Sequence, residues 1–424
     1  MCNKLSLLNF IAMSSIALII SVNVTAQIDH SNARSLAMAG AYSAVAQGVE
    51  AANWNPAVLG FNSAPVFSMR LPAFGVGVQN TSFSVADYKT YNGAALTAAD
   101  KQTILSKIPD SGFGLFLNSG ANLLGISIYR FALTANIIGA SDLRFSKTFA
   151  DLILNGNAFQ KEYDFSDTSG KGYAVAAYSL SYGQPINLPQ LDAFAVGLTV
   201  RYLQGLTIAE VVSAQGSFVT DFDGFHGDGQ AELRTAIGGS GMSVDLGTSA
   251  RFAKRWTVGL SFRNFYSNIN WKSEVKEYTY GVAADSLTAE RISESDADSL
   301  VDDFDETRDG ASFRSQLPLQ VLLGAAYTTS SMIYSFEYIQ GLSDEPGASR
   351  NPQMAFGLEY KGIGFLPLRA GLALGGREKL MTAIGFGLKL GGFSLNFATQ
   401  AHGGLFIPGT GRGLGLAFDM RIGV

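Results

Sequence analysis

Charge and cysteine are both scarce in this sequence, and each scarcity narrows the class of protein. Charged residues make up 15% of the 424 residues, whereas about 25% is usual in a soluble domain. The one cysteine, Cys2, precedes the first apolar stretch, so the rest of the chain has no thiol for disulfides or catalysis. The net charge of −5 argues against the clustered Lys and Arg of a nucleic-acid surface.

Apolar residues and glycine are abundant instead. The chain is 47% hydrophobic and contains 48 Gly and 29 Phe. This hydrophobic content excludes a disordered chain, and the absence of a three-residue glycine period excludes a collagen-like one. Beyond residue 30 no apolar run approaches the ~18 residues of a transmembrane helix. The composition therefore indicates a β-rich protein that is apolar without being helical.

The first 26 residues have the organisation of a secretory signal peptide. Lys4 supplies a weak positive start, an apolar stretch runs from Leu5 to Val22, and Val24 and Ala26 are the small residues of a cleavage site before Gln27. An uncleaved membrane anchor is the alternative. We therefore expect residues 1–26 to be a signal peptide on an exported protein.

Most of the remaining chain alternates between apolar and small or polar residues. In residues 193–205, Phe194, Val196 and Leu198 share one face, while Gly197 and Thr199 lie on the other. The same period of two, which is typical of β-strands, recurs in residues 241–253, 255–263, 384–390 and 413–422. We expect separate strands over 193–206, 208–219, 230–239 and 241–253, an initial strand near 65–85, and helices over 31–46, 97–108 and 146–154.

Two folds have such alternation, a soluble sandwich and a transmembrane barrel. Segments of about 9–13 residues suit tilted membrane-crossing strands better than sandwich strands of about 5–6. The aromatic residues Tyr202, Trp256, Phe265, Trp271, Tyr327 and Tyr360 lie near strand ends, as in an interfacial girdle. We therefore predict an all-β fold, a transmembrane antiparallel β-barrel of about fourteen strands, with sixteen as the alternative.

The phase of the alternation predicts which charged side chains face the lumen, because Arg or Lys facing lipid at mid-depth costs about 2–4 kcal/mol. Exposure to water at the rims is the alternative for several of them. Residues 282–311 contain many acids and are expected to be an extracellular acidic loop, either solvated or able to bind divalent cations. The predicted lumen-facing charges are Arg201, Asp245, Arg251, Arg263, Glu337, Glu359, Arg369, Lys389, Asp419 and Arg421.

Signals for an enzyme are nearly absent. His30, His226 and His402 lie apart from any Ser or Cys nucleophile motif. Glycine-rich stretches alternate along strands and lack the strand-to-helix context of a nucleotide loop. We expect no enzymatic activity, no cofactor and no metal site.

A compound motif precedes the first strand. It runs Ala33-Arg34-Ser35-Leu36-Ala37-Met38-Ala39-Gly40 and continues to Asn53-Trp54-Asn55-Pro56-Ala57. This resembles the N-terminal hatch of the FadL-type outer-membrane barrels, which include fatty-acid channels and the PorV-type proteins of type IX secretion. Residues 97–110 and 149–170 resemble a functionally uncharacterised branch of that superfamily.

The resemblance implies a fourteen-stranded barrel in the outer membrane of a Gram-negative bacterium. Residues 27–62 would form the hatch, a segment that plugs the lumen, and residues 63–424 would form the barrel. Small accessory helices would lie elsewhere in the chain. The predicted function is a channel for hydrophobic small molecules. The alternatives are a PorV-like barrel that binds a secretion-system partner and a structural or receptor barrel. The expected partners are outer-membrane lipid and a hydrophobic ligand, with no nucleic acid. The predicted hatch residues are Arg34, Gly40, Asn53, Asn55 and Pro56.

Overall fold

A computed structural model describes residues 31–62, 64–288, 301–377, 379–405 and 409–423. The expected signal peptide, His30 and the centre of the acidic segment lie outside these residues. Within the described chain, no helix combines the length and apolarity needed to span a membrane. Strands dominate, and a single antiparallel sheet contains all of them.

Fourteen positions around the sheet form the wall of a closed barrel, as the alternation predicts. The wall closes where β19 pairs with both β1 and β2, with Met69 opposite Ile422 and Val76 opposite Leu416. Leu71 and Pro72 interrupt the first position, which β1 and β2 share. The wall strands are β1 (Phe67–Arg70) with β2 (Ala73–Asn80), β3 (Phe113–Ile128), β4 (Phe131–Phe145), β6 (Ser169–Pro185), β7 (Ala193–Asp221), β8 (Gly224–Phe252), β9 (Trp256–Trp271), β13 (Gln320–Thr328), β14 (Met332–Gly341), β15 (Gln353–Tyr360), β16 (Leu368–Gly375), β17 (Lys379–Leu390), β18 (Phe393–His402) and β19 (Gly413–Gly423).

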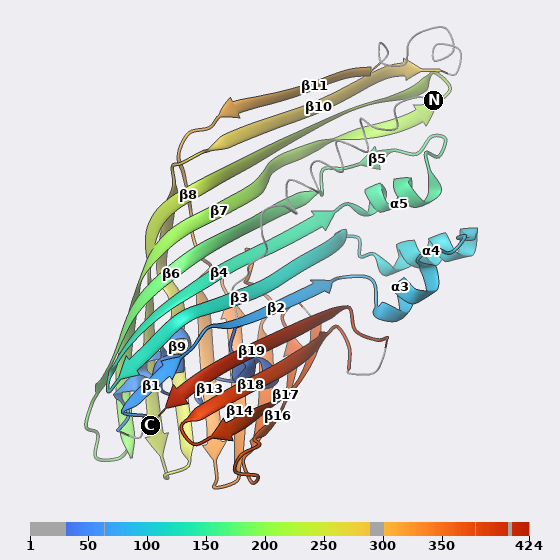
Figure 1. The fold of residues 1–424 in the computed structure, drawn as a ribbon. Helices are drawn as coiled ribbons and strands as arrows, with labels where there is room; N and C mark the ends of the chain where they lie inside the picture. The colour runs from blue at the N-terminus through green and yellow to red at the C-terminus, as the bar shows by residue number, and fades with distance from the viewer. Residues whose placement is uncertain (1–30, 63, 289–300, 378, 406–408, 424) are drawn as a thin grey trace.

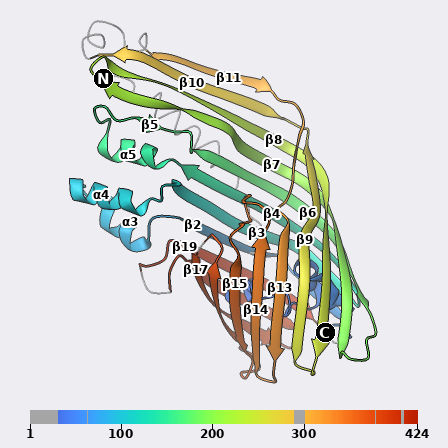
Figure 2. The same ribbon diagram turned by 180° about the vertical axis from the view of Figure 1, so that it is seen from behind.

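One side of the wall continues far beyond the rest as a flared sheet (Figures 1 and 2). Strands β7 and β8 have 29 residues each, about 95 Å at ~3.3 Å per residue, which exceeds the ~30 Å hydrocarbon core of a bilayer. The separate strands expected over 193–206 and 208–219, and over 230–239 and 241–253, are therefore single long strands. The additional strands are β5 (Tyr163–Asp164), β10 (Lys276–Leu287), β11 (Val301–Asp309) and β12 (Phe313–Ser315).

The acidic segment is mostly strand, and not the expected loop, where it is described. It contains the end of β10 and all of β11, and these strands pair along nine positions, from Lys276 opposite Asp309 to Ala284 opposite Val301. Strand β10 also pairs with β8, so the segment widens the flare. Acidic side chains are typical of solvated loops, so the sequence alone did not indicate this pairing. The pairing also depends on β8, a neighbouring strand that is distant in sequence.

Exposure alternates along the wall and defines its two faces. In β2, Phe74, Val76 and Val78 are exposed, whereas Ala73, Gly75, Gly77 and Gln79 are buried. The exposed face is apolar on most wall strands, and the buried face is small or polar. A closed barrel with an apolar exterior is a transmembrane barrel, since lipid covers that exterior. Trp271 is an exception to the expected girdle, because it is fully buried and donates to Ser315 Oγ at 2.8 Å.

The two ends of the barrel differ in their connections. At one end the connections are short, such as Tyr129–Arg130 between β3 and β4. At the other end, long segments carry α3 (Val85–Tyr91), α4 (Ala98–Lys107) and α5 (Lys147–Asn155). In outer-membrane barrels, short turns are periplasmic and long loops are extracellular. The flare therefore lies on the extracellular side of the membrane.

The helices follow local capping signals. Thr97 caps α4 with a capping box to Asp100, and Ser146 caps α5 by accepting from the Phe149 amide, so the expected helices over 97–108 and 146–154 are present. Ser84 and Asp87 form the same box on α3, whose first residue falls within the expected initial strand, near 65–85. The N-terminal segment is less helical than expected over 31–46, with α2 (Ala33–Ala37) followed only by the short 3-10 helices η1 (Gly48–Asn53) and η2 (Pro56–Gly60).

Candidate functional site: the closed lumen

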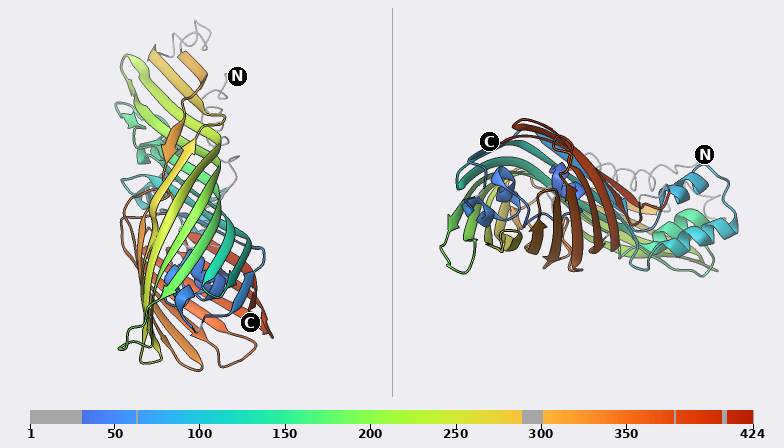
Figure 3. Two further views of the ribbon diagram at one scale, coloured as in Figure 1. Left: turned by 90° about the vertical axis from the view of Figure 1, so that its left-hand side faces the viewer. Right: turned by 90° about the horizontal axis from the view of Figure 1, so that it is seen from below.

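Residues 31–62, here called the hatch, lie inside the barrel at its short-turn end (Figure 3). Asn32 caps α2 by accepting from the Ser35 amide, and the chain then turns through Ala39 and Gly40, both with positive φ. Gly40, at φ +87°, supplies the conformation that residues with a side chain rarely adopt. Asn55 accepts from the Ala57 amide and Pro56 begins η2, which directs the chain to the first strand.

Glycines on both sides permit the close approach between the hatch and the wall, since a Cβ on Gly48 of the hatch would lie 2.3 Å from Ser68 Oγ of the wall. A Cβ on Gly197 would lie 2.2 Å from the Ala57 amide nitrogen, and one on Gly371 would lie 2.4 Å from the Met38 carbonyl carbon. No side chain fits at such distances. Sequence reasoning missed the wall positions because they look like the other small inward residues of a strand.

Glu50 is the buried acidic centre of the hatch. Its carboxylate accepts from Asn32 Nδ2 at 2.8 Å and from the Tyr42 hydroxyl at 2.6 Å. Arg421, from the last wall strand, forms an ion pair with the same carboxylate. One hatch carboxylate thus joins two other parts of the hatch to the last wall strand.

Glu359 forms a second buried cluster with two guanidinium groups. Arg34 Nε lies 2.6 Å from Glu359 Oε2, and Arg369 Nε lies 2.8 Å from the same oxygen. Arg369 also donates to Asn396, which in turn donates to Asp419. The second Asp419 oxygen accepts from the Ala33 amide at 2.7 Å, at the start of α2. Charged wall residues therefore hold the first turn of the hatch.

Other predicted charges also meet the hatch or each other. Glu337 Oε2 accepts from the Tyr42 and Ser43 amides at 3.1 and 2.9 Å. Arg263 donates to the Asn53 carbonyl at 2.5 Å and lies 5.1 Å from the centre of the Trp54 ring.

The remaining predicted charges have different surroundings. Arg201 and Asp245 form a buried bidentate ion pair between neighbouring strands. The Arg251 guanidinium lies 4.9 Å from the centre of the Phe61 ring. Lys389 is exposed close to the short-turn end of β17. Glu50, Tyr42, Asn32 and Asn396 complete the networks and were not among the predicted site residues, although Tyr42 and Glu50 lie between the two quoted stretches of the N-terminal motif.

A second obstruction crosses the lumen above the hatch. Residues 342–352, here called the inner loop, join β14 to β15, and the Pro346 carbonyl accepts from the Tyr173 hydroxyl of β6 at 3.2 Å. Lys171 lies 2.8 Å from Glu345. Arg377 donates to the Glu345 and Ala348 carbonyls and pairs with Asp142 of β4. These contacts fasten the inner loop to opposite sides of the barrel.

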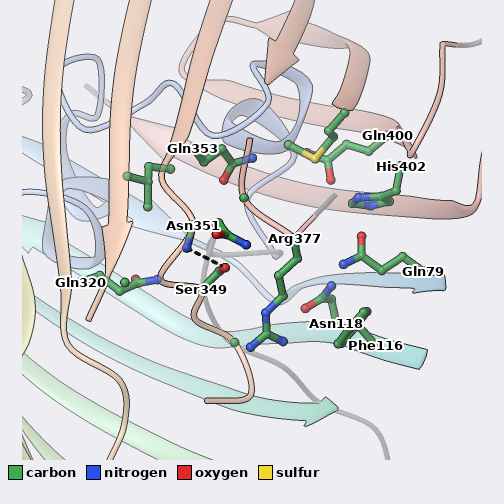
Figure 4. Close-up of a pocket in the computed structure, with 15 residues that line it drawn as sticks. Gln79, Phe116, Asn118, Gln320, Ser349, Asn351, Gln353, Arg377, Gln400 and His402 are labelled. Atoms are coloured by element: carbon green, nitrogen blue, oxygen red, sulfur yellow. Dashed lines mark hydrogen bonds between the residues drawn. The ribbon is translucent and has the colours of Figure 1, made fainter. Parts of the chain in front are cut away.

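A chamber lies between these two obstructions (Figure 4). Its cavity volume is about 50 Å³, and it is partly open to solvent. Three of its amide side chains, Gln79, Gln320 and Gln400, are at most 5% exposed. Gln400 connects it to the hatch by donating to the Leu36 carbonyl at 3.0 Å. The amide side chains that line it are Gln79, Asn118, Gln320, Asn351, Gln353 and Gln400.

The wall has one seam without backbone pairing beside the hatch. Strand β9 pairs with β13 up to Arg263 opposite Gln320, and with β12 from Ile269 opposite Ser315. Between them, no backbone hydrogen bond joins described residues 264–268 to 316–319. Side chains bridge the interval, since Asn264 Nδ2 donates to the Pro318 carbonyl and the Leu317 amide donates to Ser267 Oγ.

The hatch and the inner loop can obstruct the lumen. The buried charged side chains around them are paired with opposite charges or with backbone amides. Within the described chain, no group of three or more His, Cys, Asp or Glu is placed to hold a metal ion. The clustered acids instead face guanidinium groups or backbone amides.

Comparison with solved structures shows the same fold. A FadL homologue from Pseudomonas aeruginosa aligns over 95% of this chain and 100% of its own, with a TM-score of 0.52 and 13% identity. The toluene transporter TbuX of Ralstonia pickettii aligns over 94% and 99%, with a TM-score of 0.52 and 12% identity. The toluene transporter TodX of P. putida aligns over 93% and 97%, with a TM-score of 0.51 and 12% identity.

The resemblance to FadL-type outer-membrane barrels is thus confirmed for the fold. No curated protein matches the sequence. A family model described as a family of unknown function, DUF5723, matches residues 56–400. This match covers most of the barrel wall and the end of the hatch, and the chain therefore belongs to the DUF5723 family.

Proposed function

We propose that this protein is a channel in the outer membrane of a Gram-negative bacterium and that it passes hydrophobic small molecules. The observation that carries the proposal is the lumen itself, which a separate N-terminal segment closes through side-chain contacts. The wall closes through its own backbone pairing, so we expect the barrel to form without the hatch. The toluene transporters TbuX and TodX, which have this fold, support hydrophobic solutes as the cargo.

The seam between β9 and β13 is the proposed exit for such a solute. Side-chain bonds from Asn264 and Ser267 close it in place of a backbone ladder. Its neighbours Phe265 and Tyr266 are about half exposed on the apolar exterior. Arg263, at the edge of the seam, donates to the Asn53 carbonyl, so the seam lies beside the hatch. Under this proposal, a solute that passes the hatch reaches lipid through the seam without entering water.

Removal of the hatch tests the channel. Deletion of residues 31–55 is expected to raise conductance and uptake of a labelled hydrophobic solute in proteoliposomes. Gly40→Leu should act in the same direction, because a leucine is strained at φ +87°. Gly364→Ala is the matched control, since nothing lies within 4 Å of a Cβ at that position.

Barrel formation is measured separately by heat-dependent migration in gels. If the deleted protein inserts as a barrel and both conductance and uptake stay unchanged, the channel proposal is wrong. Loss of binding to a secreted protein, with uptake unchanged, would favour the partner-binding alternative instead.

A further inference from the structure

We propose that the chamber between the hatch and the inner loop binds the hydroxyl group of an uncharged solute. The inference rests on the proposed function and narrows its cargo to neutral alcohols, as opposed to carboxylates or pure hydrocarbons. Three observations on the lining carry it: its charge, one buried acceptor and its apolar part.

The charge of the lining favours a neutral ligand. Among the described residues that line the chamber, none is acidic and Arg377 is the one guanidinium group. Arg377 is already paired with Asp142 and donates to two carbonyls of the inner loop. A carboxylate entering the chamber would lose its hydration without meeting an unpaired guanidinium group. The imidazole of His402, which is 2% exposed, also lines the chamber and already takes part in another contact. A cation would find no carboxylate on the lining.

The side chain of Gln400 favours a ligand with a hydroxyl group over a ligand that has no hydrogen-bond donor. The side chain is fully buried, and its Nε2 donates to the Leu36 carbonyl of the hatch. Its Oε1 has no hydrogen-bond partner among the described residues. A buried acceptor left unpaired is costly, so this oxygen calls for a donor. An alcohol O–H donates, whereas a carboxylate only accepts and a hydrocarbon does neither.

Two further amides are placed to complete such a site. Asn118 on β3 and Gln353 on β15 line the same chamber from different wall strands (Figure 4). An amide side chain offers both donors and an acceptor, which matches a hydroxyl that donates and accepts. A hydroxyl bound to Gln400 Oε1 can thus accept from a second amide.

The apolar part of the lining suits the body of the solute. Phe116, Ile339 and Met381 line the chamber, and all three are at most 9% exposed. Phe116 contacts Arg377 through its ring, with 5.1 Å from the guanidinium carbon to the ring centre. The chamber therefore combines a hydrogen-bonding part with an apolar part, as an alcohol with a hydrocarbon body requires.

Three ligands with one carbon skeleton test the inference. Benzyl alcohol, benzoate and toluene are compared at neutral pH by saturation-transfer NMR with the full protein in nanodiscs, and empty nanodiscs correct for partition into lipid. We expect benzyl alcohol to bind roughly fivefold more tightly than the other two, which corresponds to about one net hydrogen bond.

Substitutions then locate the site. Gln400→Leu should remove the preference for the alcohol. Because Gln400 also contacts the hatch, Gln353→Leu provides a second variant that leaves the hatch contacts intact, and it should weaken alcohol binding while toluene binding stays unchanged. Gln204→Leu, on the exposed face of β7, is the matched control and should bind all three ligands like the parent protein.

The outcomes of these binding experiments distinguish a failure of the alcohol site from a failure of the channel proposal. Equal or weaker binding of benzyl alcohol than of toluene or benzoate overturns the inference, even if the hatch deletion raises uptake. An alcohol preference that neither Gln400→Leu nor Gln353→Leu reduces also overturns it. A preference that both variants reduce supports it, even if the hatch deletion leaves uptake unchanged and so contradicts the channel alone.

Discussion

Glu359 shows how individual wall residues hold the hatch. Its carboxylate is almost fully buried and accepts from the guanidinium groups of Arg34 in the hatch and Arg369 in the wall. Two cations share this anion, so its removal leaves both without their main counter-charge in a buried setting. Such a loss is more severe than the loss of a surface ion pair, because the remaining charges cannot regain full hydration.

The first prediction follows from this cluster. Glu359→Ala should destabilise docking of the hatch by about 3–5 kcal/mol, the usual cost of breaking a buried ion pair by removing one partner. Hydrogen exchange of peptides from residues 31–62 measures it, and their amides should exchange at least about a hundredfold faster. Glu162→Gln, at an exposed position, is the control. Unchanged protection of the hatch in the Glu359 variant would contradict the assigned role.

At the scale of elements, the inner loop and the extracellular helices are separate units fastened by few contacts. Arg377 alone contributes two hydrogen bonds to carbonyls of the inner loop and one ion pair to β4. The helices α3 and α4 are joined by the ion pair of Asp87 with Lys107. Elements held by so few groups are the ones expected to move first.

The second prediction concerns the inner loop. Arg377→Met keeps an unbranched apolar side chain over Phe116 but removes the bonds to the Glu345 and Ala348 carbonyls, so the loop should leave the lumen more often. Single-channel recordings in planar bilayers should show higher conductance or more frequent openings. Arg350→Met alters an exposed arginine of the same loop and is the control. Identical recordings from both variants would mean that the loop does not restrict the lumen.

The third prediction is a pH dependence of α3. Burial raises the pKa of Asp87, but the hydrogen bonds from Lys107 and Ser84 together lower it more, so the pKa lies below its ordinary value. The stabilisation is therefore complete above the unfolded pKa of about 4 and is lost as the pH falls through the lower folded pKa. Pepsin cleavage within residues 84–112 should accelerate steeply over that acidic range.

The matching variants make the pH test specific. Asp87→Asn should be cleaved faster than the parent protein already at about pH 4, because the ion pair is absent and the capping box is weakened. Asp167→Asn, at an exposed position, should follow the parent profile. A parent profile that is as flat as that of Asp87→Asn would exclude Asp87 as the group responsible.

At the scale of the whole molecule, the proposed channel has two candidate exits from the lumen. One leads past the hatch toward the short-turn end, and the other leads through the seam between β9 and β13. A solute that is more soluble in lipid than in water gains free energy by leaving through the wall, since apolar surface then avoids hydration. A disulfide across the seam would lower uptake of a solute that leaves through the wall, but not of one that leaves past the hatch.

The fourth prediction uses that lock. The described chain contains no cysteine, so Ser267→Cys with Leu317→Cys introduces one pair across the seam, where the Leu317 amide already donates to Ser267 Oγ at 3.0 Å. Oxidation should lower uptake of a hydrophobic solute, and reduction should restore it in the same sample. Equal uptake in the oxidised and reduced forms would place the exit elsewhere.

The wall could be predicted from the sequence because its signal is local. A strand alternates with a period of two, and in a membrane the exterior must be apolar at every depth. Residues such as Val76 and Leu416 therefore reveal their orientation without knowledge of their neighbours. The helices α4 and α5 were predictable for a similar reason, since Thr97 and Ser146 cap them from positions next to the helix.

Only the tertiary structure decided which groups meet inside the barrel. Arg421 and Glu50 are separated by 371 positions, and Arg34 and Glu359 by 325, so their contact depends on strand register and barrel closure, which no local pattern encodes. The same reason explains the inner loop, the pairing of β10 with β8 and the burial of Trp271. The sequence by itself determined a barrel wall with an apolar exterior, because lipid acts on every strand alike. The plug, the chamber and the seam required the closed barrel, because each arises from side chains that only closure brings within reach.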